Sequence, residues 1–243
     1  MNRILALIIL LFSSNLALAE AFNFDMGSAG DTSSRMLQMV AIITVLSLAP
    51  SIIMMVTSFT RIVVVMSFLR SAIGLQQSPP NSILISLSLF LTLFIMSPTI
   101  EKSYHDGILP LVENKINEKQ AFWLTVKPFS EFMIKHTREK DLDLFLSIAK
   151  KSEEEVKTVD DVPLQILIPA FMISELRRAF EIGFLVFVPF LIIDLLISSL
   201  LMAMGMMMLP PVMIALPFKL IFFVITDGWY MICGSLVKSY GIN

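Results

Sequence analysis

Two histidines and a single cysteine are the side chains of this sequence best suited to catalysis or to binding a transition metal. His105 and His136 lie far apart, and neither has a cysteine or a second histidine at the spacing of a metal site. Cys233, in the segment MICGSL, has no histidine or acid beside it that would activate a thiolate. Motifs that cradle phosphates or carry a nucleophilic serine are absent from the sequence. The sequence therefore predicts no enzyme, no metal site and no cofactor.

Charged side chains inside apolar stretches are the remaining candidates for a functional role, because a charge in apolar surroundings is costly unless it is paired. In SELRRAFE, Glu175 and Arg178 are spaced i, i+3 and Arg177 and Glu181 are spaced i, i+4. One helix can therefore neutralise its own charges. Three interpretations stay open: a self-paired turn at a membrane edge, ion pairs between subunits, and a proton relay.

Arg61 and Asp194 each stand alone in an apolar run, SFTRIVVV and FLIIDLLISS. Each needs a partner, and the sequence leaves open whether that partner lies in the same subunit or in a neighbouring one. Asp194 is also a candidate carboxylate for coupling an ion to transport. Lys219 and Asp227 lie on roughly the same face of the last apolar stretch, so they can meet.

Methionine is concentrated in LLMAMGMMMLPP, residues 200–211. A methionine-rich helix end usually fills irregular gaps in a core. Here Gly205 loosens the helix and two prolines end it, so the last three methionines fall at the tip of a turn, where no gap needs filling. We assign Met202 and Met204 to packing and expect a separate role for Met206, Met207 and Met208.

The composition sets the class of protein that must position these residues. Hydrophobic residues make up 56% of the 243 residues and charged residues only 16%, with a mean hydropathy of +0.81. These shares indicate a membrane protein. A net charge of -2 without any basic patch argues against nucleic-acid binding, which requires a basic face.

The N-terminus has the three parts of a secretory signal peptide, residues 1–19. Arg3 supplies the positive charge, ILALIILLF the apolar segment, and ALA at residues 17–19 the cleavage motif. We expect cleavage after Ala19, which would place the new N-terminus outside the cytoplasm. Residues 20–35 are rich in Gly, Ser and Asp without periodicity and predict a flexible leader.

The uneven distribution of charge predicts the domain organisation. Between residues 36 and 100 only Arg61 and Arg70 are charged, whereas residues 101–161 hold 23 of the 38 charged side chains. We predict a first apolar helical hairpin over residues 36–100, with one helix over 36–69, a turn at GLQQSPPN, Asn81 as the cap of the second helix, and an end at SPT. The single helix over 36–69 would be about 50 Å long, against roughly 30 Å of hydrocarbon, so tilt, kinks or protein contacts must take up the excess.

Residues 101–162 predict a small polar insert of amphipathic helices on the periplasmic side, with Pro128 in the first turn of one helix. Residues 163–243 predict a second apolar hairpin, kinked at Pro169 and Pro189, with the methionine-rich segment at its turn. The expected fold class is therefore an all-α membrane protein, with two long kinked apolar helical hairpins flanking the insert after a cleaved signal peptide.

Two long segments, PAFMISELRRAFEIGF and PFLIIDLLISSLLMAMGM, resemble the signature blocks of the FliP family, the flagellar type III export-gate proteins whose injectisome relatives are called SctR. Residues 46–81 and 216–237 resemble the family's other characteristic stretches. The resemblance covers nearly all of the chain after about residue 36 and is weakest in the polar insert. The signal peptide and the size of the insert favour the flagellar branch.

The resemblance implies a pore-forming core subunit of the flagellar protein export gate in the bacterial inner membrane, within the flagellar basal body. Such subunits are expected to form a homopentamer with FliQ-like and FliR-like subunits, to conduct unfolded flagellar proteins, to work with FlhB-type and FlhA-type proteins, and to help nucleate basal-body assembly. The family's methionine gasket, which closes the pore, would fall on Met206, Met207 and Met208. The alternative from the residues alone is a small-solute or ion transporter that uses Asp194 and broken helices.

Overall fold

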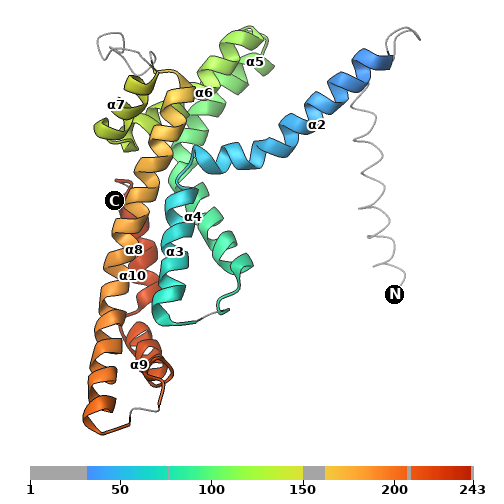
Figure 1. The fold of residues 1–243 in the computed structure, drawn as a ribbon. Coiled ribbons are helices and arrows are strands. Elements are labelled where there is room, and N and C mark those ends of the chain that lie inside the picture. Colours follow the sequence, from blue (N-terminus) through green and yellow to red (C-terminus); the bar gives the residue numbers. More distant parts are fainter. Residues whose placement is uncertain (1–31, 76, 150–161, 207–208, 242–243) are drawn as a thin grey trace, which may run out of the picture. The chain divides into compact units, whose positions relative to one another are not determined.

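The computed structural model of the chain describes residues 32–75, 77–149, 162–206 and 209–241, and these form helices and their connections without any strand (Figure 1). The all-helical prediction is confirmed for these residues. The predicted signal peptide, its cleavage site after Ala19 and most of the leader lie outside them. The helices are α2 (Thr32–Met55), α3 (Phe59–Ile73), α4 (Asn81–Ser103), the π-helix η1 (Tyr104–Ile108), α5 (Leu109–Val112), α6 (Glu118–His136), α7 (Glu139–Ile148), α8 (Leu164–Ala203), α9 (Pro211–Ile225) and α10 (Gly228–Lys238).

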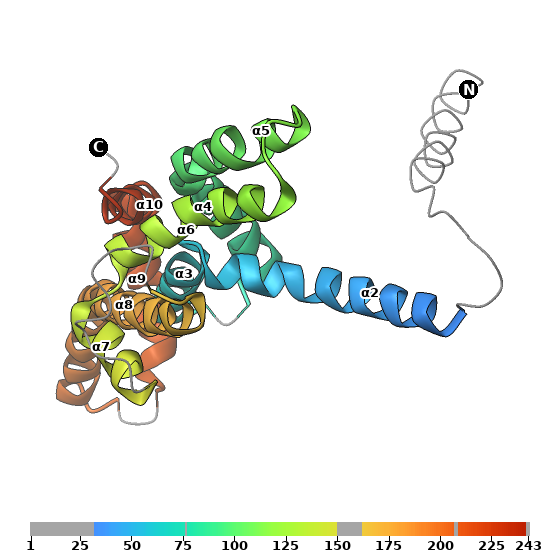
Figure 2. The ribbon, with the colours of Figure 1, turned by 90° about the horizontal axis from the view of Figure 1, so that it is seen from above.

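The chain divides into two compact units, residues 1–48 and 49–243. In the second unit, α3 lies along α8 in the most extensive helix contact (Figure 2). The buried face of α3 is apolar at the spacing of helix turns and contributes Ile62, Val65, Met66 and Leu69 to the core. This contact builds the centre of the unit.

The prediction of one helix over residues 36–69 is wrong, because α2 ends at Met55 and α3 begins at Phe59. At the break, the hydroxyl groups of two threonines form hydrogen bonds with backbone groups. The Thr57 hydroxyl accepts the N–H of Phe59 at 3.4 Å, and the Thr60 hydroxyl donates to the carbonyl of Met54 at 3.2 Å. Such side-chain bonds offer the backbone an alternative to the helical ladder.

The predicted end of the second apolar helix near residue 98 is also wrong. α4 runs through Pro98 to Ser103, and η1 and α5 continue it to Val112. Asn81 is the first residue of α4 rather than its cap, and its side-chain oxygen accepts a hydrogen bond from Arg70 at 2.5 Å. The predicted boundary between hairpin and insert therefore falls inside a continuous helix.

The insert contains the expected amphipathic helices. Asn117 and Gln120 form a reciprocal capping box that starts α6. Because this cap lies well before Pro128, the proline is in the middle of α6 and not in its first turn, which corrects the prediction. The buried face of α6 carries Met133, which packs with Leu167 and Phe171 of α8.

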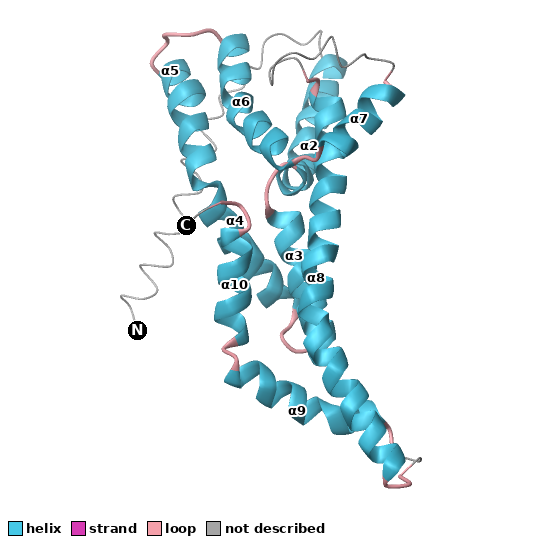
Figure 3. Cartoon of the chain, turned by 90° about the vertical axis from the view of Figure 1, so that its left-hand side faces the viewer, coloured by secondary structure: helices cyan, strands magenta, loops and turns pink. Residues whose placement is uncertain are grey.

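The second apolar block contains α8, whose 40 residues span about 60 Å and run through both Pro169 and Pro189. The return to the C-terminus is broken in two: α9 and α10 meet at Asp227, whose φ is 49°, and differ in direction by 62° (Figure 3). Among the residues that the structure describes, two helical segments, Asn81–Val112 and Leu164–Ala203, are long and apolar enough to cross a membrane. Up to four spans result if the bent pairs Met39–Met55 with Phe59–Ile73 and Pro211–Ile225 with Gly228–Lys238 each count as one.

Candidate functional site

Arg61 and Glu175 form a buried ion pair between α3 and α8. The Nε of Arg61 donates to Oε2 of Glu175 at 2.9 Å, and Nη2 donates to Oε1, so the contact is bidentate. Arg61 is 1% exposed and Glu175 is fully buried. The planar guanidinium matches a carboxylate in this geometry, and the pair leaves neither charge uncompensated in the core.

The C-terminal end completes this group, which we call the Arg61 cluster (Arg61, Glu175, Ser239 and Tyr240). Ser239 accepts a hydrogen bond from Nη1 of Arg61 at 3.0 Å, and the hydroxyl of Tyr240 donates to Oε2 of Glu175. The guanidinium carbon lies 3.9 Å from the centre of the Tyr240 ring, a cation–π contact. Three parts of the chain that are far apart in sequence are therefore joined by one buried charge pair.

These contacts bear on the interpretations that the sequence left open. Arg61 pairs within the chain, and the carboxylate of Glu175 accepts hydrogen bonds from Arg61 and Tyr240, so the self-paired interpretation does not hold for Glu175 and Arg178. Arg177 and Glu181 do pair along the helix at 2.8 Å, with both side chains about half exposed.

A second polar group lies next to the Arg61 cluster on α8. Ser174 donates to Oδ2 of Asp141 at 2.6 Å and accepts the backbone N–H of Arg138, whose guanidinium pairs with both oxygens of Asp141. Burial raises the pKa of Asp141, but the hydrogen bonds from Ser174 and Arg138 and the nearby arginine charges outweigh it and hold this pKa below its usual value. The insert is thereby attached to α8.

Asp194 has a partner as well. The Nζ of Lys219 donates to its Oδ2 at 2.6 Å and to the carbonyl of Ala72 at 3.2 Å, near the C-terminal end of α3. Asp194 and Lys219 pair within the chain, so Lys219 does not form the contact with Asp227 that the sequence allowed. The other oxygen of Asp194 is buried without a hydrogen-bond partner among the described residues.

The methionine-rich segment follows a well-defined helix end. The N–H of Gly205 bonds to the carbonyl of Met202, and that of Met206 bonds to the carbonyl of Leu201, as in a Schellman cap. Gly205 has φ of 74°, a conformation that favours glycine. Met202, Met204 and Met206 are 63%, 52% and 45% exposed. Met202 and Met204 therefore do not fill gaps inside this chain, contrary to our assignment, because their helix turns carry them to the surface; Met207 and Met208 lie outside the described residues.

Several of these residues escaped sequence reasoning. Ser239 and Tyr240 lie in the short C-terminal segment, and Asp141 and Ser174 are part of patterns that look like ordinary polar helix faces. The pairing of Asp194 with Lys219, in contrast, did have a signal in the sequence, because each is an isolated charge in an apolar stretch. Within the described ranges, no group of three histidine, cysteine or acidic side chains could hold a metal ion.

The fold and these sites define a class, an all-helical membrane protein whose isolated charges form structural pairs. The sequence matches the FliP family over residues 42–236, and the chain belongs to that family. It is 53% identical to the flagellar biosynthetic protein FliP of Caulobacter vibrioides over 91% of this chain and 82% of the relative. It is 49% identical to the protein of the same name from Bacillus subtilis, over 91% of this chain and 99% of that one, and 48% identical to that of Agrobacterium fabrum over 96% of both.

Family membership confirms the resemblance found in the sequence and assigns the chain to flagellar biosynthesis, as a structural component rather than an enzyme. Its apolar helices indicate a membrane location.

Proposed function

We propose that this chain is a pore-forming core subunit of the flagellar type III protein export gate, which conducts unfolded flagellar proteins across the bacterial inner membrane and helps to nucleate the basal body. The observation that carries the proposal is the segment around the end of α8, where the side chains of Met202, Met204 and Met206 are about half exposed instead of packed. The segment continues with Met207 and Met208 before two prolines. Membership in a family of flagellar biosynthetic proteins supports the setting.

A ring of methionines suits a gate for unfolded chains. The side chain is unbranched and apolar, has three rotatable bonds and has no strong polar preference. Met206, Met207 and Met208 from several subunits would exclude ions by dewetting the narrow point of the pore, yet move apart around an extended polypeptide of any sequence.

The proposal includes an assembly: a homopentamer with FliQ-like and FliR-like subunits, working with FlhB-type and FlhA-type proteins in the inner membrane and basal body, with the insert on the periplasmic side. The length of α8 supports protein neighbours, because about 60 Å of helix exceeds the roughly 30 Å of hydrocarbon that lipid can cover. Leu195 and Leu196 remain exposed near its end and need such a neighbour or lipid.

A transporter that uses Asp194 is the alternative function. The pairing of Asp194 with Lys219 favours a structural role, because a carboxylate that is held by an ammonium group at 2.6 Å is already neutralised. Its second oxygen has no hydrogen-bond partner among the described residues, and this observation is the reason to test the alternative.

Replacement of Met206, Met207 and Met208 by Ala tests the gate. In cells that export flagellar proteins, we expect the triple variant to leak small ions across the inner membrane, measured with an ion-sensitive dye, while secretion of flagellar subunits continues. Met39, Met54 and Met231 are exposed methionines elsewhere, and their triple Ala variant is the matched control that should stay tight.

The transporter alternative is tested with Asp194→Asn alone and together with Lys219→Met, since the double variant removes both charges. If the methionine variant does not leak ions, and the single and the double Asp194 variants both lose transport activity, the chain is a transporter and the proposed gate is wrong. If the double variant is active, Asp194 is structural. If neither set of changes alters permeability, the chain is a scaffold without a methionine gasket.

A further inference from the structure

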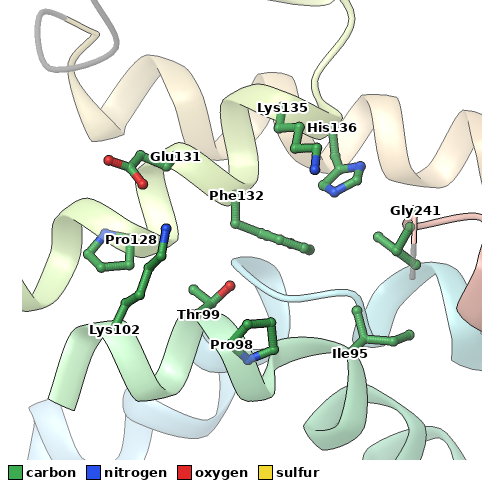
Figure 4. A pocket seen from close by; sticks show the side chains of 11 residues that line it. Ile95, Pro98, Thr99, Lys102, Pro128, Glu131, Phe132, Lys135, His136 and Gly241 are labelled. Atoms are coloured by element: carbon green, nitrogen blue, oxygen red, sulfur yellow. The ribbon is translucent and has the colours of Figure 1, made fainter. Parts of the chain in front are cut away.

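A pocket of about 330 Å³ lies between α4, α6 and the C-terminal end (Figure 4). Its α4 side carries Pro98, Thr99 and Lys102, and its α6 side carries Glu131, Phe132 and Lys135. In Figure 4, Lys102 rises from α4 toward α6, with Thr99 and Phe132 in the space between the helices. The pocket therefore has an apolar floor with charged groups around it.

The charge around this pocket is positive. Lys102 and Lys135 contribute two positive charges and Glu131 one negative charge. His136 also lines the pocket and stays neutral near pH 7, because burial and the charges of Arg61, Lys135 and Arg178 lower its pKa to about 4. A net charge of +1 in the pocket lining, with lysines from two different helices, suits an anionic group that sits between the helices.

An apolar stripe leads away from the pocket along the surface of α4. Phe90, Phe94 and Pro98 precede Lys102 at intervals of four residues, so they form a slanted row on one side of the helix. Phe90 is 70% exposed and Phe94 is 61% exposed. From Phe90 to Lys102 the helix rises about 18 Å, close to the roughly 15 Å of one hydrocarbon leaflet.

Another cavity between α4 and α6 differs in chemistry. It measures about 610 Å³ and opens among Leu93, Met96, Phe122 and Phe129, with no charged side chain in its lining. The cavity with lysines is therefore the one suited to a headgroup. α4 belongs to a segment long and apolar enough to cross a membrane, and Lys102 follows its apolar part, where a helix reaches the headgroup level.

We propose that the pocket binds the phosphate of an anionic phospholipid between Lys102 and Lys135, with the acyl chains along Phe94 and Phe90. Cationic pockets beside membrane helices hold anionic headgroups in this way. The lipid would brace α6 against α4, because Lys135 lies on α6 and Lys102 lies near the C-terminal end of α4. This site is independent of the methionine segment.

Native mass spectrometry of the purified full chain in detergent tests the site, with dioleoyl phosphatidylglycerol and dioleoyl phosphatidylcholine as probes. We expect the anionic lipid to bind more tightly. The change Lys102→Ala with Lys135→Ala should weaken its binding by about tenfold or more, because each lysine near an anionic headgroup contributes about fivefold. The control is Lys115→Ala with Lys119→Ala, which removes the same charge from exposed positions outside the pocket and should leave binding unchanged.

Glu131→Gln should change the lipid affinity in the opposite direction to the lysine variants. A misfolded variant would not bind the lipid more tightly, so this result distinguishes a binding effect from misfolding. Removal of the negative charge of Glu131 from the pocket lining should strengthen binding of the anionic lipid severalfold. The proposal is overturned if both lipids bind equally, if the control pair weakens binding as much as the pocket pair, or if Glu131→Gln has no effect. Inorganic phosphate that displaces the lipid at equal concentration would identify a free-phosphate site instead, and a change in oligomer mass without a change in lipid binding would identify an acidic surface of a second copy.

Discussion

Removal of the carboxylate charge of Glu175 should destabilise the chain strongly, because it leaves the Arg61 guanidinium buried without a counter-ion. Glu175→Gln keeps the volume of the side chain but removes its charge and replaces one acceptor oxygen by an NH2 donor. Arg61 is 1% exposed, so water cannot replace the lost partner, and Ser239 offers only a neutral oxygen. Breaking one side of a buried ion pair costs about 3–5 kcal/mol, a large share of the roughly 5–15 kcal/mol that stabilises a typical domain.

A double-mutant cycle separates the interaction energy of Arg61 with Glu175 from the other contacts of the Arg61 cluster. Arg61→Met alone should cost a similar amount, because it leaves the carboxylate with Tyr240 as its remaining hydrogen-bond donor. The double variant Arg61→Met with Glu175→Gln removes both charges, so its loss should fall short of the sum of the two single losses by about 2–3 kcal/mol.

The measurement is the free energy of unfolding of the detergent-solubilised chain, followed by tryptophan fluorescence during denaturant titration. Glu181→Gln is the matched control, since the same chemical change is made in an exposed pair with Arg177 on the same helix, and we expect it to shift the midpoint little. Equal midpoint shifts for Glu175→Gln and Glu181→Gln, or losses of the two single variants that simply add, would refute a stabilising role of the buried pair.

Two further predictions concern packing and pH. Gly107→Ala should cost about 1–3 kcal/mol of unfolding free energy, because the new Cβ would lie 2.2 Å from the hydroxyl and 2.7 Å from the backbone nitrogen of Thr125. Gly234→Ala, with open space around it, should be neutral or stabilising in the same titration, and equal effects of the two changes would contradict this account. The lowered pKa of His136 means that the unfolded chain binds more protons between about pH 4 and 6.5, so stability should fall as the pH drops through this window. His136→Gln should reduce this loss of stability at low pH, whereas the exposed control His105→Gln should not. If the free energy of unfolding depends on pH equally in the His136 variant and the unchanged chain, this histidine is not the cause.

Much of the secondary structure was predictable because it depends on local pattern. The apolar run of α4, the turn before Asn81 and the amphipathic spacing of the insert helices all depend on residues a few positions apart. The errors lie where local signals compete. Pro98 and Pro128 predict helix boundaries in isolation, yet both lie inside helices, since tertiary packing outweighs the one hydrogen bond that each proline removes.

From sequence alone, an all-helical membrane protein without catalytic motifs was predictable, and Arg61, Glu175, Asp194 and the methionine-rich turn stood out as unusual. Composition and periodicity suffice for this, because the cost of exposed apolar groups and of unpaired charges is the same in any fold. The partners of the charges could be identified only from the packing of the helices: Arg61 pairs with Glu175 and Asp194 pairs with Lys219. Those choices depend on which helices pack together, and many long-range arrangements satisfy the same local pattern equally well.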